Sequence, residues 1–302
     1  MINKIKKYTP VALFVYKRPE HTRKTLEALC KNIDADKTDL FVFSDAAKNR
    51  EEENKVQEVR NIISNIKGFK SVKIIKQSSN KGLANSIIDG VSKVISQYGT
   101  VIVIEEDLIT APTTLQYFNK CLTTYKDKCS VFSISAFNYP EHLLSIPDSY
   151  PYDVYYIPRM QCWGWATWQD RWLKADWSMK NFQDFCTNET ETSAYQYWIG
   201  SNSLKTLNSC VTDGKDVWAC RWVYTHYKHQ GMCLCPVSSY IDNIGLDGTG
   251  ENCGHNSNYT NNLSQSTENT LNLPENIFIE PDIFKRFMTL ADPGWQKDTC
   301  NE

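Results

Sequence analysis

The sequence lacks both a membrane-length apolar run and a secretion signal. Among its 302 residues, no stretch approaches the roughly 18 consecutive apolar residues of a membrane-spanning helix. The basic start, Met1–Lys7, is not followed by the apolar core and small-residue cleavage site of a signal peptide, because Val11–Tyr16 is only as long as a strand. We therefore expect a cytoplasmic protein, with at most a peripheral contact at the inner face of a membrane.

An excess of basic residues and a zinc-binding cysteine pattern are also missing. The formal net charge is -2, and Lys and Arg are scattered rather than gathered in one stripe, which argues against a nucleic-acid partner. The 11 cysteines form no paired zinc motif, and Cys233-Leu234-Cys235 is too closely spaced for one. We predict that most of them are buried thiols and not a disulfide framework.

Short β-rich apolar runs alternate with helical patterns in the first half of the chain. The predicted strands are Val11–Tyr16, Leu40–Ser44, Val72–Ile75 and Val101–Ile104. Three helices are predicted. The first begins at Pro19, the second carries an apolar stripe from Val56 to Ile66, and the third carries one from Leu83 to Ile95. This alternation predicts a parallel sheet whose strand ends meet at one edge, where ligands bind in open α/β folds.

Polar residues follow these strands at the points where each one ends. Glu105-Glu106-Asp107 comes directly after the apolar run Thr100–Ile104. Lys17-Arg18, Asp45 and Asn80-Lys81-Gly82 follow other strands or open a helix. Taken singly, each could be a solvated acidic turn, a surface cation, a turn former or a helix entry. Their convergence predicts a site for a hard divalent cation bound to a diphosphate.

The second half loses the alternation and becomes rich in aromatic residues. Eight of the 9 tryptophans lie between Trp163 and Trp222. Such rings either bind the apolar face of a sugar or build the core. Because Gly164 interrupts it, we expect the segment Trp163–Trp168 to be an exposed or mobile loop. We expect Gly245–Gly254 to be a closing loop or disordered, and the amphipathic Ile283–Met288 to dock on the domain or lie on a membrane, with docking favoured.

Several of these segments resemble the GT-A glycosyltransferases, within them N-acetylglucosaminyltransferase I and the related bacterial family 2 sugar transferases. Pro10–Pro19 resembles the family's first strand and nucleotide-contacting turn, and Phe43-Ser44-Asp45 resembles its second strand. Asn80–Ala84 followed by Val103–Leu108 is the most specific pairing, because it resembles the helix entry and the DXD-type motif. This sequence has Glu105 and Glu106 at the two positions before Asp107, and so departs from the strict DXD motif.

The resemblance covers about Pro10 to Gly245 and implies an α/β fold of the GT-A, Rossmann-like kind. In that fold a mostly parallel sheet is flanked by helices. Residues 1–130 are then the nucleotide-sugar-binding half, and residues 131–255 are the acceptor-binding and catalytic-base half of the same domain. Residues 256–302 are an irregular tail with a short amphipathic helix.

The resemblance also implies roles for particular residues. Asp107 holds Mn²⁺ or Mg²⁺, and Asp216 is the catalytic base, with Asp213 as the alternative if the alignment slips. The implied contacts to the nucleotide sugar are Arg18, Asp45, Lys81, Gly82, Glu105 and Glu106. The implied contacts to the acceptor are Trp163, Trp165 and Trp218. His255 could meet the metal or the diphosphate if its loop closes, whereas His226 and His229 read as ordinary polar residues.

The activity implied is inverting transfer of a sugar, from a UDP-sugar or another nucleoside-diphosphate sugar, to a hydroxyl of a saccharide or lipid-linked saccharide. The product would be a surface polysaccharide or lipid-linked oligosaccharide. Sugar nucleotidyltransferases use much the same sheet, but they carry a Gly-rich loop after the first strand, and Tyr16–Pro19 has no glycine. A non-catalytic carbohydrate-binding protein would explain the tryptophans and leave the carboxylates without a purpose.

Overall fold

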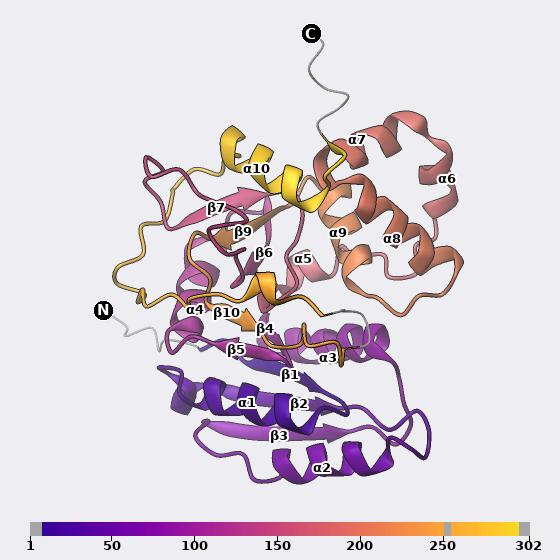
Figure 1. The fold of residues 1–302 in the computed structure, drawn as a ribbon, viewed down its shortest axis with the longest axis vertical. Helices are drawn as coiled ribbons and strands as arrows, with labels where there is room; N and C mark the ends of the chain where they lie inside the picture. The colour runs from indigo at the N-terminus through magenta and orange to yellow at the C-terminus, as the bar shows by residue number, and fades with distance from the viewer. Residues whose placement is uncertain (1–7, 251–254, 296–302) are drawn as a thin grey trace.

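The protein is built on one large sheet, seen in a computed structural model that describes residues 8–250 and 255–295 (Figure 1). The sheet has eight strands in the order β3-β2-β1-β4-β8-β6-β9-β7, and a two-stranded sheet pairs β10 with β5. The strands are β1 (Val11–Val15), β2 (Asp39–Ser44), β3 (Ser71–Lys76), β4 (Thr100–Glu105), β5 (Leu108–Thr110), β6 (Val131–Ser135), β7 (Val154–Ile157), β8 (Trp165–Trp168), β9 (Met232–Pro236) and β10 (Ile241–Asn243).

Helices cover both faces of this sheet (Figure 1). They are α1 (Pro19–Cys30), α2 (Glu53–Ile63), α3 (Leu83–Tyr98), α4 (Thr114–Thr124), α5 (Gln169–Trp172), α6 (Phe182–Thr187), α7 (Glu189–Ile199), α8 (Ser201–Thr212), α9 (Ala219–Lys228) and α10 (Pro281–Ala291). Two short 3-10 turns span Ala35–Lys37 and Ser257–Tyr259. The predicted first-half strands and helices are therefore present, with ends that differ by a few residues.

The first four strands are parallel, as the alternating pattern predicts. β1 pairs in parallel with β2 on one side and with β4 on the other, and β2 pairs in parallel with β3. β8 and β7 run antiparallel to their neighbours β4 and β9. The prediction of a mostly parallel α/β sheet flanked by helices is confirmed, and the carboxyl ends of β1, β2 and β4 meet at one edge.

β1 and the inner parts of β2 and β4 are apolar because both faces of the sheet are covered there, whereas the edge strand β3 alternates and exposes Ser71, Lys73 and Lys76. Ala12 and Phe14 pack toward α3, whereas Val11, Leu13 and Val15 pack with residues of α1, α2 and α4. A strand buried on both sides needs an uninterrupted apolar run, whereas a strand with one wet face would alternate. This explains why the runs are so easily read from the sequence.

The tryptophan segment differs from the expected exposed or mobile loop. Its last four residues form strand β8, which pairs antiparallel with β4 and β6 at the centre of the sheet. Trp165 is fully buried, and its ring stacks on those of Trp218 and Trp172. Gly164 lies just outside the strand in the left-handed region, with a φ of 66°, so its conformational freedom serves the entry to a buried strand.

The amphipathic segment near the end of the chain forms α10 and docks on the domain. Ile283, Phe287 and Met288 are buried in the same core as the tryptophans. The Arg286 guanidinium donates to the Ser145 carbonyl at 2.9 Å. No helix in the described part of the chain is long and apolar enough to cross a membrane.

Several cysteines and one histidine are buried in the protein. The nine described cysteines are free thiols, and five of them are buried. His226 is buried in the core and donates from Nδ1 to the Trp222 carbonyl, while Ser133 donates to its Nε2; both contacts are 2.8 Å. Burial lowers the pKa of His226 to about 4. It is a core residue whose two ring nitrogens are both hydrogen-bonded.

Candidate functional site

Three carboxylates emerge where β4 ends. Glu105 is the last residue of β4, and Glu106 and Asp107 form the turn into β5. Burial, with the nearby charges of Asp107 and Glu106, raises the pKa of Glu105 to about 8. Burial also raises the pKa of Glu106 to about 8, although its carboxylate accepts the Tyr16 amide hydrogen at 2.5 Å. The strand end thus concentrates acidic groups, a setting that favours a cation.

Arg18 supplies the positive charge that faces this cluster. Its Nη1 donates to Asp107 Oδ2 at 2.7 Å, and its Nη2 donates to Thr249 Oγ1 at 2.9 Å and to Asp247 Oδ1 at 3.3 Å. His21 Nε2 lies 3.1 Å from the other oxygen of Asp247. The guanidinium therefore joins the acidic turn to the glycine-rich loop near the end of the chain, which lies against the site in this structure.

The small β5–β10 sheet brings that loop to the carboxylates. β5 begins directly after the acidic turn, and β10 pairs antiparallel with it. The Ile244 amide donates to the Asp107 carbonyl at 3.0 Å. A Cβ at Gly245 would collide with the Asp107 carboxylate. Glycine at this position is thus what allows the backbone to pass so close to Asp107.

Asp45 fixes the turn that opens α3. It follows β2 and is buried, and its carboxylate accepts amide hydrogens from Lys81 at 3.0 Å and from Gly82 at 3.1 Å. Ser86 Oγ lies 3.4 Å from the same carboxylate. The Asn80 side chain donates to the Ala46 carbonyl at 2.7 Å. These contacts hold the 80–82 turn against the end of β2, where the sequence placed both elements.

Asp216 lies at the amino-terminal end of α3, although it comes from the loop between α8 and α9. Its two carboxylate oxygens accept the amide hydrogens of Leu83 at 2.7 Å and Ala84 at 2.8 Å. The amino end of a helix favours a negative charge because its first N–H groups lack intrahelical partners. Asp213 instead ends α8, where it accepts from Thr212 at 2.9 Å.

The close approach of Asp216 to α3 depends on Gly82. This residue has a φ of 78° and a ψ of 169°, a region essentially restricted to glycine, and a Cβ there would lie 2.5 Å from Asp216 Oδ2. We expect Gly82→Ala to lower the free energy of unfolding by about 3 kcal/mol, measured by urea denaturation.

Gly99 offers a matched control for this substitution. It ends α3 with a φ of 81° in the left-handed region, and nothing lies within 4 Å of a Cβ built there. Gly99→Ala should therefore lose only about 1 kcal/mol, the backbone cost alone. Equal losses in the two variants would show that neither the contact with Asp216 nor the backbone conformation of residue 82 adds to the cost.

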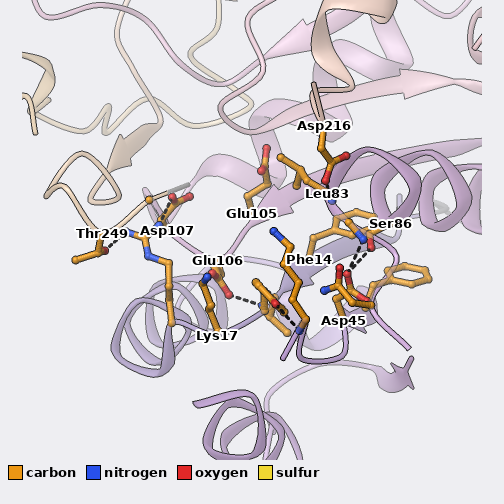
Figure 2. A pocket seen from close by; sticks show the side chains of 18 residues that line it. Phe14, Lys17, Asp45, Leu83, Ser86, Glu105, Glu106, Asp107, Asp216 and Thr249 are labelled. Atoms are coloured by element: carbon orange, nitrogen blue, oxygen red, sulfur yellow. Dashed lines mark hydrogen bonds and ion pairs between the residues drawn. The ribbon is translucent and has the colours of Figure 1, made fainter. Parts of the chain in front are cut away.

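The carboxyl ends of β1, β2 and β4, the amino-terminal end of α3 and Asp216 line one pocket of about 250 Å³. Figure 2 shows Asp107 and Thr249 on one side of it, Asp45 and Ser86 on the other, and Glu105 between them, with Asp216 beside Leu83. Of the predicted site residues, the structure brings together in this pocket Arg18, Asp45, Gly82, Glu105, Glu106, Asp107 and Asp216.

Some residues differ from their predicted place. The Lys81 side chain does not line the pocket and pairs with Asp89 at 2.6 Å, although its amide binds Asp45. Lys17 and Lys48 line the pocket instead. Lys48 and Thr249 were missed by sequence reasoning because neither follows a strand or belongs to a recognisable motif. His255 is exposed and forms an isolated backbone bridge with Asp247.

The predicted acceptor tryptophans separate into two kinds. Trp165 is 0% exposed and Trp218 is 2% exposed, and their rings stack 5.0 Å apart within the core. A ring without an exposed face cannot bind a sugar, so these two predictions are corrected to core packing. Trp163 is partly exposed, with its ring against those of Phe137 and Tyr259. Of the three tryptophans, it is the one with a surface that an acceptor could contact.

Comparison with known proteins identifies the family. Residues 11–181 match the profile described as glycosyl transferase family 2, which is more than half of the chain. The chain belongs to glycosyl transferase family 2. The matched part of this family 2 protein includes β1 to β4 and the acidic turn, and it ends before Asp216. No curated protein matches the chain.

Solved structures resemble this family 2 chain distantly. A mannosyltransferase from Pyrobaculum calidifontis, in complex with GDP-Man and Mn²⁺, shares 13% identity over 55% of this chain and 46% of its own, with a TM-score of 0.38. TarS from S. aureus shares 14% identity over 47% of this chain and 23% of its own (TM-score 0.32). A UDP-glucose pyrophosphorylase shares 11% identity over 76% of this chain and 90% of its own (TM-score 0.36). With scores this low, none of them carries its substrate over to this chain.

Proposed function

We propose that this protein transfers a sugar from a nucleoside-diphosphate sugar to a hydroxyl of a saccharide acceptor, with inversion at the anomeric carbon. The observation that carries the proposal is the shared pocket of Asp45, Asp107 and Asp216, three carboxylates from three separate parts of the chain. Family 2 membership supports the reaction class. We also propose that the protein is of the N-acetylglucosaminyltransferase I-like kind within this class.

On the donor side, Asp45 and Gly82 would shape the floor beneath the nucleoside. Asp45 already binds the 80–82 turn through its carboxylate, so it would order that turn as well as accept a hydrogen bond from the base or ribose. Arg18 would exchange part of its contact with Asp107 for the diphosphate, because a guanidinium pairs well with phosphate oxygens. Lys17 and Lys48 would take the place proposed for Lys81 as further cations.

The carboxylates of the pocket fit a metal ion that binds together with the diphosphate of the sugar nucleotide. Among residues 8–250 and 255–295, no three His, Cys, Asp or Glu side chains are grouped to hold a metal ion. Mn²⁺ or Mg²⁺ commonly binds through one or two carboxylates together with substrate phosphates, and Asp107 is placed to be such a carboxylate. When bound, the ion would neutralise charge on the departing diphosphate.

Asp216 would act as the general base toward the acceptor hydroxyl. Each carboxylate oxygen has two lone pairs, so accepting the Leu83 and Ala84 amides leaves acceptor capacity on both oxygens. Deprotonation of the hydroxyl as it attacks C1 from the face opposite the leaving diphosphate would invert the configuration. Trp163 would offer a partly exposed ring to the acceptor.

A UDP-sugar donor and a product in surface polysaccharide or lipid-linked oligosaccharide assembly complete the proposal. Both follow from the family resemblance. A thermal-shift panel of UDP-, GDP-, CMP- and dTDP-sugars, each with and without Mn²⁺, tests the donor site, because a ligand that binds the native state raises its melting temperature. We expect a metal-dependent rise with UDP-sugars. A rise with another nucleotide would change the donor class, and no rise with any sugar nucleotide would overturn the proposal.

A further inference from the structure

Two cysteines face each other at the base of the loop that carries Asp216. Cys210 belongs to the last turn of α8 and Cys220 to the first turn of α9, and their Sγ atoms are 2.8 Å apart. Both side chains are buried. The loop between the two helices includes Asp216, which binds the amino end of α3. The thiols thus stand at the two ends of a functional loop.

The geometry suits a disulfide between them. A disulfide has an S–S length of about 2.05 Å, so the two sulfurs would need to approach by less than about 1 Å. Because α8 and α9 pack together, the two helices hold these sulfurs close to each other. Cys233 and Cys235 are the other close pair, but they lie 3.8 Å apart on the same strand β9.

The surroundings also make the two thiols unequal. The Cys220 thiol donates to the Cys210 sulfur, and with Arg221 and Lys215 nearby this lowers the pKa of Cys210 to about 7 despite its burial. The same hydrogen bond, together with burial, raises the pKa of Cys220. Arg221 Nη2 donates to the Cys210 carbonyl at 3.3 Å, which keeps a positive charge beside this cysteine. Since a thiolate is the attacking form in disulfide exchange, we assign the attack to Cys210.

We propose that Cys210 and Cys220 form a redox-active pair that reacts with a low-molecular-weight disulfide and closes a covalent loop around Asp216. The Cys210 thiolate attacks the small disulfide, which gives a mixed disulfide and releases one thiolate. That thiolate takes the Cys220 proton, and the Cys220 sulfur then attacks Cys210 and releases the second small thiolate. The two cysteines are oxidised to one disulfide, and the reagent is reduced to two thiols.

Both sulfurs are buried, so the reagent reaches them when the exposed loop between them moves aside. Residues 212–216 are exposed, and Gly214 has a φ of 68° with nothing within 4 Å of a Cβ built there. Closure would fix both ends of this loop, and so restrict the carboxylate that binds the Leu83 and Ala84 amides. Its effect on catalysis rests on the proposed function, because it assumes that Asp216 is the base. We expect hydrogen exchange at these two amides to slow in the oxidised protein.

Peptide mapping of the full chain tests the pair directly. Trypsin cleavage after Lys205, Lys215 and Arg221 places Cys210 in residues 206–215 and Cys220 in residues 216–221, so only a disulfide joins the two peptides. After native protein is treated with oxidised glutathione and alkylated, we expect this linked pair, and its loss on reduction. Recovery of both peptides alkylated, or linkage through Cys233 or Cys235 in their place, would overturn the proposal.

Two single variants act as controls for the order of attack. Cys220→Ser should stop at a glutathione adduct on Cys210, whereas Cys210→Ser should give far less adduct on Cys220. Equal adduct formation in the two variants would overturn the assignment of the nucleophile. The linked peptide does not depend on any sugar nucleotide. A linked peptide in a protein that binds no sugar nucleotide would therefore defeat the proposed function and leave the cysteine pair standing.

Discussion

Asp107→Ala is expected to remove the metal-dependent part of donor binding. Asp107 is the carboxylate of the acidic turn that both lines the pocket and pairs with Arg18 at 2.7 Å. Loss of a metal ligand worth several kcal/mol corresponds to donor affinity at least roughly 100-fold weaker in the presence of Mn²⁺. Titration calorimetry of the UDP-sugar, with and without Mn²⁺, measures the difference, and the variant should give the same weak binding in both.

Two further variants separate metal binding from local structure. Asp107→Asn keeps the shape and an oxygen that can accept from Arg18, so it should retain the loop contact and still lose the metal dependence. Asp89→Ala removes an exposed carboxylate that pairs with Lys81 outside the pocket, and it should bind donor like the wild type. If Asp107→Asn and Asp107→Ala both kept a full response to Mn²⁺, the metal ligand would have to be another residue.

The sheet was predictable because β1, β2 and β4 are buried on both faces. An unbroken apolar run such as Val11–Val15 has one simple explanation, and the helical stripes between the runs dictate parallel pairing. The strand β8 was not predictable in the same way. Its sequence, Trp165–Trp168, gives aromatic residues that suit a sugar site as well as a core, and its partners β4 and β6 lie far away in the chain. The pairing with distant strands determines that these aromatic residues pack in the core and do not form a sugar site.

The site follows a similar division between local and long-range signals. Asp45, Arg18 and Asp107 follow strands, so the topology alone brings them to one edge. The loop with Asp247 and Thr249 reaches Arg18 only through the β5–β10 pairing. Two three-residue strands give too little pattern to be read from a sequence. The contact between Asp216 and the amino end of α3 was equally hidden, since it joins segments more than a hundred residues apart.

Asp216→Asn is expected to leave donor binding intact while turnover falls by about 100-fold or more, the usual cost of losing a general base. The amide keeps one oxygen for the Leu83 or Ala84 N–H but presents an NH₂ group to the other, so the helix end is weakened by about 1 kcal/mol. Such a loss leaves a folded protein. Turnover of the UDP-sugar with a saccharide acceptor and calorimetric donor affinity, measured on the same preparation, separate the two effects.

Asp213→Asn is the matched control, because Asp213 lies in the same loop but ends α8 and does not line the pocket. It should turn over like the wild type. A fall in Asp213→Asn with normal turnover in Asp216→Asn would move the base to Asp213 and reduce Asp216 to a cap for α3. If Asp216→Asn instead lost donor affinity and turnover together, the carboxylate would act by positioning the 80–84 segment. The proton would then have to leave through another group of the pocket.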